Sequence, residues 1–144
     1  MHIYHYGAYE INALRRLMGR FGVKEYEVDT LLRNEVFVDL YKIIRQGLLV
    51  GEPSYSIKNI EHLYREKRDT EIASGGESVV VYEEWRANPD GKTWKDSKTL
   101  NAIRMYNIDD CNSTQELTEW LRERQQDAGC LLYTSDAADD QACG

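Results

Sequence analysis

The chain has 144 residues, of which 42% are hydrophobic and 30% charged, a composition typical of a single globular domain. No apolar run is long enough to span a bilayer and no signal peptide opens the chain, so we expect a cytoplasmic protein without a membrane partner. The net charge of −7 would by itself exclude many nucleic-acid-binding proteins. However, the last eighteen residues carry four aspartates and no basic side chain, so the charge of the rest is much closer to neutral.

These last residues are set apart from the fold. Residues 130–140, CLLYTSDAADD, resemble the in-frame translation of a sequencing adaptor, and the alternative is an ordinary disordered acidic terminus. We therefore divide the chain into a partial domain, 1–126, and a disordered tail, 127–144. If the adaptor interpretation holds, the sequence is a gene fragment.

Cysteine content excludes two common kinds of site. The tail holds two of the three cysteines, and the remaining one, Cys111, supports neither a disulfide framework nor a zinc site. A zinc site built from His2, His5 and Cys111 has no familiar ligand spacing, and we discount it.

The predicted elements alternate between strands and helices only in the first third of the chain. In order, they are a strand at 3–6, helices at 8–21 and 25–33, a strand at 35–38, helices at 40–46 and from 57, a flexible loop at 65–76, a helix at 77–87, and a long helix capped by Thr93 or Asp96 and ending near Arg124. This order predicts an α/β fold with a helix-rich C-terminal half and too few strands for a complete sheet.

The first helix carries an acid on its apolar stripe. Leu14, Leu17 and Phe21 share one side of the helix, and Glu10 lies within about 40° of each of them. A carboxylate in the first turn of a helix is also favoured by the helix dipole. Residue pattern alone therefore leaves a ligand role and a dipole role for Glu10 equally open.

The last helix repeats this feature with two polar residues. Tyr106 and Asp110 lie within its apolar stripe, whereas Asp109 points about 120° away and is expected on a solvated face. A buried carboxylate needs a cation, a proton or several donors. From the pattern alone, a hydrogen-bonded buried pair explains Tyr106 and Asp110. The apolar members of the stripe are Leu100, Ile103, Thr114, Leu117 and Leu121.

A meeting of Glu10 with Asp110 would call for a cation. Two carboxylates a few ångströms apart cannot both stay ionised without one between them. Mg²⁺ or Mn²⁺ is the ordinary partner of such acids.

At this point the residues resemble a family. Tyr106-x-x-x-Asp110 is similar to the third motif of the tyrosine subclass of the DEDD 3′–5′ exonucleases, which have an RNase H-like fold. Residues 5–10 resemble their second motif, and residues 38–40 and 54–58 match segments between the motifs. The resemblance spans about residues 3–123 and is best for the RNase H-like domain of predicted RecB-type nucleases, in which a RecB/Cas4-type module lies upstream.

The sequence departs from this family in three ways. Asn usually stands at the position of His5, and Asp at that of Glu10. The first motif, an Asp-x-Glu on the first strand of the sheet, has no counterpart and would lie upstream of Met1. The resemblance therefore implies an RNase H-like domain truncated at its N-terminus, and we expect this fragment to be inactive and poorly folded.

The resemblance also implies roles in the complete domain. Asp110 and Glu10, with the two absent acids, would bind two Mg²⁺ or Mn²⁺ ions, and Tyr106 would orient the attacking water. The reaction would be metal-dependent hydrolysis at the 3′ end of nucleic acid, expected to be single-stranded DNA. The alternative is a non-catalytic RNase H-like module that binds DNA or positions a neighbouring nuclease or helicase.

Basic and aromatic side chains give weaker signals. Lys58 and Arg15 are the best candidates for nucleic-acid contacts, although basic residues on exposed helix faces are usually only solvated. The large aromatics Tyr82, Trp85 and Trp120 are expected in the core.

Two polar residues at strand ends have structural interpretations. Asp39 follows the second predicted strand, and we interpret it as a helix N-cap rather than a ligand. His5 is interpreted as a packing or hydrogen-bonding residue rather than a catalyst.

Overall fold

The chain forms two compact units, and its last helix contributes to both. The computed structural model describes residues 1–66 and 74–128. The first unit comprises residues 1–64 with the chain from 114 onward, and the second comprises residues 65–113. Most of the predicted loop and nearly all of the predicted tail therefore lie outside the described residues.

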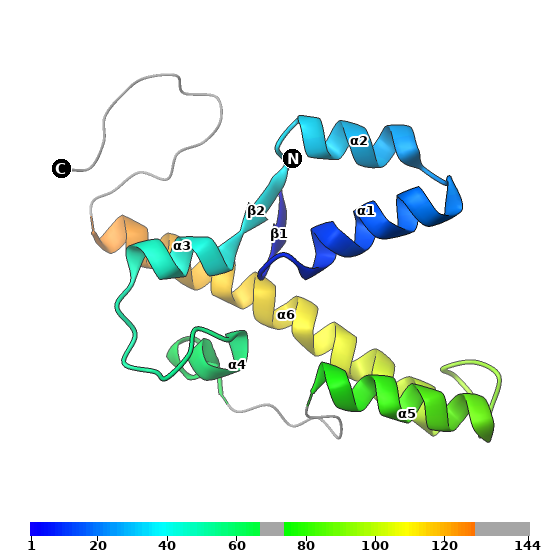
Figure 1. The fold of residues 1–144 in the computed structure, drawn as a ribbon. Coiled ribbons are helices and arrows are strands. Elements are labelled where there is room, and N and C mark those ends of the chain that lie inside the picture. The colour runs from blue at the N-terminus through cyan, green and yellow to red at the C-terminus, as the bar shows by residue number, and fades with distance from the viewer. Residues whose placement is uncertain (67–73, 129–144) are drawn as a thin grey trace. The chain divides into compact units, whose positions relative to one another are not determined.

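The observed elements follow the predicted order (Figure 1). They are β1 (Ile3–His5), α1 (Tyr9–Phe21), α2 (Glu25–Arg33), β2 (Phe37–Asp39), α3 (Leu40–Gly47), α4 (Ile57–Ile60), the 3-10 helix η1 (Glu61–Leu63), α5 (Gly75–Ala87) and α6 (Lys98–Asp127). The described chain is thus mostly helical α/β with a small parallel sheet. None of its described helices is long and apolar enough to cross a membrane.

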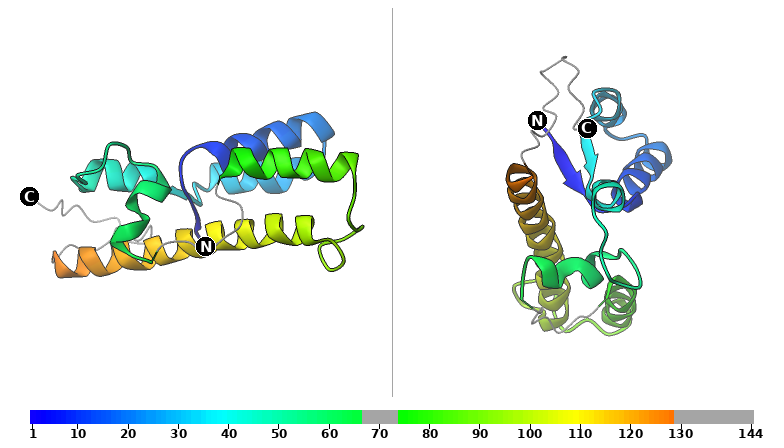
Figure 2. Two further views of the ribbon diagram at one scale, coloured as in Figure 1. Left: turned by 90° about the horizontal axis from the view of Figure 1, so that it is seen from below. Right: turned by 90° about the vertical axis from the view of Figure 1, so that its left-hand side faces the viewer.

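The sheet consists of two short parallel strands joined by the α1–α2 pair. Ile3 pairs with Phe37 and His5 with Asp39, so β1 and β2 end at the same edge (Figures 1 and 2). Parallel strands require a long crossover connection, and two helices supply it here. The carboxyl edge of this sheet is where the turns into α1 and α3 begin.

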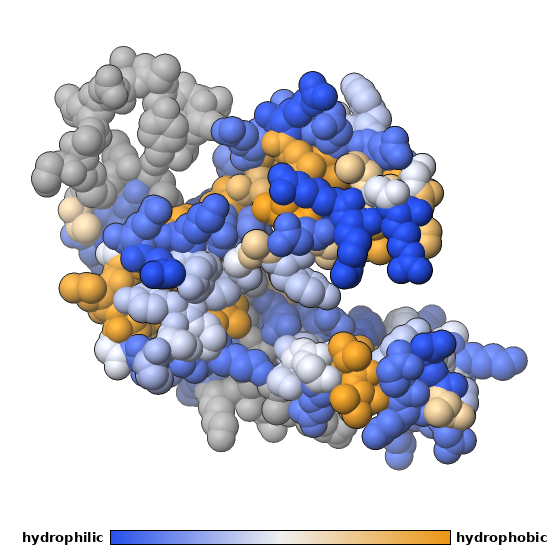
Figure 3. Space-filling view, in the orientation of Figure 1, coloured by the Kyte–Doolittle hydropathy of each residue, from blue (hydrophilic) through white to orange (hydrophobic). Residues whose placement is uncertain are grey.

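The predicted apolar stripe of α1 is only partly covered. Leu14 is half-buried, whereas Leu17 is 47% exposed and Phe21 is 61% exposed. Figure 3 shows hydrophobic side chains at the surface around α1 and α2, among hydrophilic ones. Periodicity identifies which side of a helix is apolar, but another element must pack there before that side is buried.

The core of the first unit is small and lies where α3, α4 and the second half of α6 meet. Leu40, Ile44, Ile60 and Leu117 are each at most 1% exposed. The helical spacing of residues 40–46 predicts that Leu40, Ile43 and Ile44 all face inward, and this is wrong for Ile43, which is 38% exposed. The half-buried residues that surround this core are Tyr4, Tyr6, Val38, Leu48, Val50, Tyr55, Tyr64, Trp120 and Leu121.

The second unit is built on α5 and the first half of α6, which run antiparallel and are joined by the loop 88–97 (Figure 2). Trp85, near the end of α5, donates its indole N–H to the carbonyl of Gly91 at 3.1 Å. Tyr82 stacks on Trp85 with 5.6 Å between the ring centroids. The prediction of Tyr82 as a core residue is wrong, because it is 44% exposed.

The start of α6 corrects a predicted cap. The helix begins at Lys98, and Ser97 Oγ accepts a hydrogen bond from the backbone N–H of Leu100 at 3.0 Å. Thr93 and Asp96 instead hydrogen-bond to each other inside the preceding loop. Because both residue types are good caps and turn formers, the sequence pattern did not separate the two uses.

Candidate functional site

Glu10 stands just beyond the carboxyl end of β1. A turn at Gly7, whose φ is +81°, leads from His5 into the first turn of α1, and this backbone conformation favours glycine. The Glu10 side chain is 51% exposed, and its Oε2 lies 4.0 Å from Nδ1 of His5. Glu10 is therefore a partly solvated carboxylate at the edge of the sheet rather than a buried one.

His5 fixes the turn that carries Glu10. Its residue is 4% exposed, and its Nδ1 lies 2.6 Å from the carbonyl oxygen of Gly7. A carbonyl can only accept a hydrogen bond, so Nδ1 carries the hydrogen. The predicted hydrogen-bonding role of His5 is confirmed.

Asp39 joins the two strand ends. Its Oδ1 accepts from the backbone N–H of Gly7 at 2.9 Å and from that of Tyr41 at 3.1 Å. The second bond caps α3, which confirms the predicted N-cap. The turn before Glu10 and the start of α3 are therefore held by one carboxylate.

A buried phenol lies beside this edge within the first unit. The hydroxyl of Tyr6 donates to the carbonyl of Tyr55. Burial raises the pKa of Tyr6 well above its ordinary value, and the neighbouring Tyr64, Tyr41 and Asp39 raise it further. Tyr6 is thus a neutral hydrogen-bond donor at any ordinary pH.

Tyr106 and Asp110 lie one turn apart on the part of α6 that belongs to the second unit. Tyr106 is 7% exposed, as its position in the apolar stripe predicts, and Asp110 is half-buried. A Cβ built on Gly75, the first residue of α5, would lie 3.8 Å from the Tyr106 hydroxyl oxygen. The phenol therefore reaches the start of α5.

The prediction that Asp109 is solvated is wrong. Its side chain is 16% exposed, and its Oδ1 lies 2.7 Å from Nη2 of Arg65, whose side chain is equally buried. Arg65 also donates to the backbone carbonyl of Asp109 at 3.4 Å. Arg65 lies 44 positions before Asp109 in the chain. The spacing of residues within α6 therefore could not predict this ion pair.

The described residues do not form a metal site. Within residues 1–66 and 74–128, no group of three or more His, Cys, Asp or Glu side chains could hold a metal ion. Glu10 belongs to the first unit and Asp110 to the second, and each is described within its own unit. Glu10 and Asp110 account for two of the four acids that the family resemblance implies.

The predicted basic contacts lie on exposed helices of the first unit. Arg15 on α1 and Lys58 on α4 are both exposed. Sequence reasoning passed over Trp94 in the second unit, which is 46% exposed and contacts Arg104. The sequence feature that could have identified Trp94 as a candidate binding residue is its position among four basic residues within 92–104.

Comparisons with known proteins place the chain in a family. The family model RNase_H_2, described as RNase_H superfamily, matches residues 1–122, which is most of the chain. A search of curated proteins and a search of solved structures found no match. This match over most of the chain shows that the chain belongs to the RNase H superfamily.

Proposed function

We propose that this chain is part of a metal-dependent 3′–5′ exonuclease that acts on single-stranded DNA in a RecB-type nuclease. The observation that carries the proposal is the superfamily match over residues 1–122. It is supported by Glu10 at the carboxyl edge of the sheet and by Tyr106 and Asp110, one turn apart on α6. Catalytic acids at the carboxyl ends of parallel strands are common in α/β enzymes.

Each candidate residue has a chemical role in this proposal. Glu10 and Asp110 are carboxylates, the ligand type that Mg²⁺ and Mn²⁺ prefer, and they would supply two of the four acids that the family resemblance implies. When bound, the divalent ions would polarise the phosphate and lower the pKa of water. Tyr106 would orient the attacking water by a hydrogen bond from its hydroxyl. The product is a nucleotide released from a 3′ end.

Substitution of Asp110 in the protein encoded by the complete gene tests the proposal. Asp110→Asn should reduce Mn²⁺-dependent trimming of a 5′-labelled single-stranded DNA by more than about 100-fold, because loss of even an outer partner of a metal ligand reduces activity or metal affinity about 10–100-fold. Asp127→Asn, on the same helix with its carboxylate 65% exposed, is the matched control and should leave trimming unchanged.

Three outcomes decide between the candidate functions. Full trimming by a folded Asp110→Asn protein overturns the metal-ligand role. Absence of trimming in the unsubstituted complete protein, together with DNA binding, favours the non-catalytic RNase H-like module instead. Tyr106→Phe keeps the buried ring and removes only the hydroxyl, so unchanged trimming by that variant would exclude the water-orienting role.

A further inference from the structure

Trp94 is an exposed aromatic side chain that contacts cations. It lies in the loop between α5 and α6 and is 46% exposed. The guanidinium carbon of Arg104 lies 4.3 Å from the centroid of its indole, and Nζ of Lys95 lies 5.5 Å away. All three residues belong to the second unit. A large apolar ring held at the surface among cations is a common feature of ligand-binding surfaces.

The charge around Trp94 is opposite to that of the whole chain. Residues 92–104 contain four basic side chains and one acid, although the chain carries a net charge of −7. Two carboxylates bond within this segment: Asp96 accepts from the backbone N–H groups of Lys92 and Thr93, each at 2.8 Å, and Asp90 accepts from Ser97 and Thr99. The four basic side chains still outnumber these two acids. The surface around Trp94 therefore favours an anionic ligand.

Two shallow depressions flank Trp94. One, of about 470 Å³, is lined by Trp94, Arg104 and Cys111 among others. The second, of about 570 Å³, is lined by Trp94, Lys95 and Lys98 among others. Trp94 lines both depressions, and each has at least one cationic side chain in its wall, so a ligand chain that contacts the indole can also reach a positive charge.

The loop that carries Trp94 is already ordered by internal bonds. Asp90 accepts from the hydroxyl of Ser97 and, at 3.1 Å, from the backbone N–H of Thr99. The indole of Trp85 bonds to Gly91 on the other side of the loop. A loop held in this way loses less conformational freedom on binding than a mobile one.

We propose that the Trp94 surface, defined as Trp94 with Lys95, Lys98 and Arg104, binds single-stranded nucleic acid. One base stacks on the indole, and the flanking phosphates contact the cationic side chains. An aromatic platform among basic residues is the usual means of holding an unpaired strand without reading its sequence. The surface deepens the proposed function by naming where its substrate is held, but binding here requires neither metal nor cleavage.

Fluorescence anisotropy of the full chain with labelled dT20 and U20 in EDTA tests the proposal. Both strands should bind, with an affinity that falls as salt rises. Trp94→Ala should weaken binding by about 5- to 150-fold, the effect of losing one stacked base. The matched control, Tyr26→Ala on α2, removes an aromatic residue that is 81% exposed and should change nothing.

A charge variant separates stacking from phosphate contact. Replacing Lys95 and Lys98 with alanine should flatten the plot of log affinity against log salt by about 0.7 for each phosphate that the variant no longer neutralises. The same double substitution at Lys42 and Arg45, which are exposed on α3, should leave the slope unchanged. The proposal is overturned if Trp94→Ala, still folded by circular dichroism, binds dT20 as tightly as the parent, or if polyglutamate competes as well as dT20.

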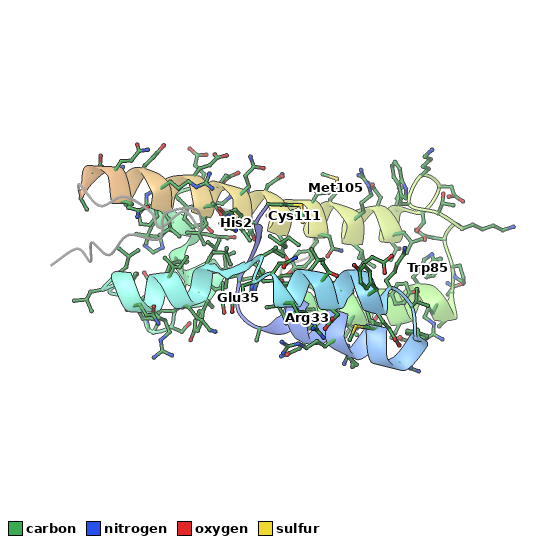
Figure 4. All side chains as sticks on the ribbon, turned by 90° about the horizontal axis from the view of Figure 1, so that it is seen from above. His2, Arg33, Glu35, Trp85, Met105 and Cys111 are labelled. Carbon is green, nitrogen blue, oxygen red and sulfur yellow. The ribbon has the colours of Figure 1, made fainter. Side chains whose placement is uncertain are left out.

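Cys111 provides an independent footprint. It is exposed, lines one of the depressions and lies about two turns beyond Arg104 on α6 (Figure 4). With the two tail cysteines replaced by serine, saturating dT20 should slow its reaction with a maleimide several-fold. An unchanged rate overturns the placement of the strand. Because EDTA prevents cleavage, these results are independent of the exonuclease proposal.

Discussion

At the scale of single residues, Asp39 stabilises two backbone segments at once. Its carboxylate caps α3 and also bonds to the turn at Gly7. Asp39→Ala should lower the free energy of unfolding by about 1–2 kcal/mol, the usual effect of losing a cap, as measured by urea denaturation. Asp39→Asn keeps an acceptor oxygen and should retain most of the stability. Equal losses in both variants would show that charge rather than hydrogen bonding matters here.

The Arg65–Asp109 pair gives a second prediction at this scale. Because both side chains are only 16% exposed, removing one charge leaves the other poorly solvated. Asp109→Asn should cost about 1.5–3 kcal/mol of unfolding free energy, seen as a lower thermal midpoint. The neighbouring Asp110→Asn should mainly affect trimming, so the two adjacent aspartates are expected to separate stability from activity. A larger loss of stability in the Asp110 variant would contradict this division.

Residue type and helical spacing predicted some roles and not others. The cap at Asp39 was predictable because a short polar side chain between a strand and a helix has few alternatives. The burial of Tyr106 was predictable from the stripe of α6. The ion pair of Asp109 was not, because periodicity describes a helix by itself and omits the partners that tertiary packing brings to it.

At the scale of elements, the loop before α6 should be sensitive to acid. Hydrogen bonding by the Ser97 hydroxyl is the main cause that lowers the pKa of Asp90, and bonding by the Thr93 hydroxyl is the main cause that lowers the pKa of Asp96. A lowered folded-state pKa means that this stabilisation is present at neutral pH and is lost as the pH falls below about 4 and through the folded value.

The measurement is the emission of Trp94 during acid titration. Trp94 lies within this loop, so its emission should shift towards that of a solvated indole as Asp90 and Asp96 are protonated. The variant with Asn at both positions should show a much smaller change over the same range. Because Trp85 and Trp120 also emit, the parent is compared with Trp94→Phe. An emission shift that persists in Trp94→Phe would come from Trp85 or Trp120 and would contradict the prediction.

Gly91 gives a backbone test of the same loop. A Cβ at this position would lie 2.5 Å from the carbonyl oxygen of Asp96, closer than side chains approach backbone. Gly91→Ala should therefore destabilise the second unit by about 1–3 kcal/mol. Gly19→Ala, in the interior of α1 with nothing within 4 Å of the added carbon, should instead be neutral or stabilising by up to about 1 kcal/mol. Thermal denaturation of both variants checks the contrast.

The order and type of the elements could be predicted because each has a strong local pattern. Their ends were less certain: α5 begins at Gly75 rather than at 77, and α6 begins at Lys98 after Ser97. Several polar residues in each connection are competent caps, and the choice between them depends on which hydrogen bonds the folded loop makes. The exposed fraction of an apolar stripe, as on α1, depends on what packs against it and is not a property of the helix sequence.

At the scale of the whole molecule, the superfamily was predictable from the spaced motifs, and the family match over residues 1–122 agrees with it. The candidate site was predictable only as separate parts. Glu10 follows a strand end in one unit and Asp110 lies on a helix in the other. No local sequence pattern predicts the distance between the two carboxylates. Their joint binding of a metal therefore stays a prediction. Net charge was similarly uninformative, because −7 conceals the basic segment 92–104.

The uncovered side of α1 has a consequence for concentrated solutions. Phe21 at the end of α1, Val23 after it and Tyr26 on α2 are each more than 60% exposed, whereas the neighbours of the exposed Leu49 in the chain, Leu48 and Val50, are half-buried. Clustered apolar surface attracts neighbouring molecules more strongly than isolated apolar surface. Light scattering should therefore give a second virial coefficient that rises markedly in Phe21→Ser and hardly at all in Leu49→Ser. The apolar side of one helix would then limit the colloidal stability of the protein.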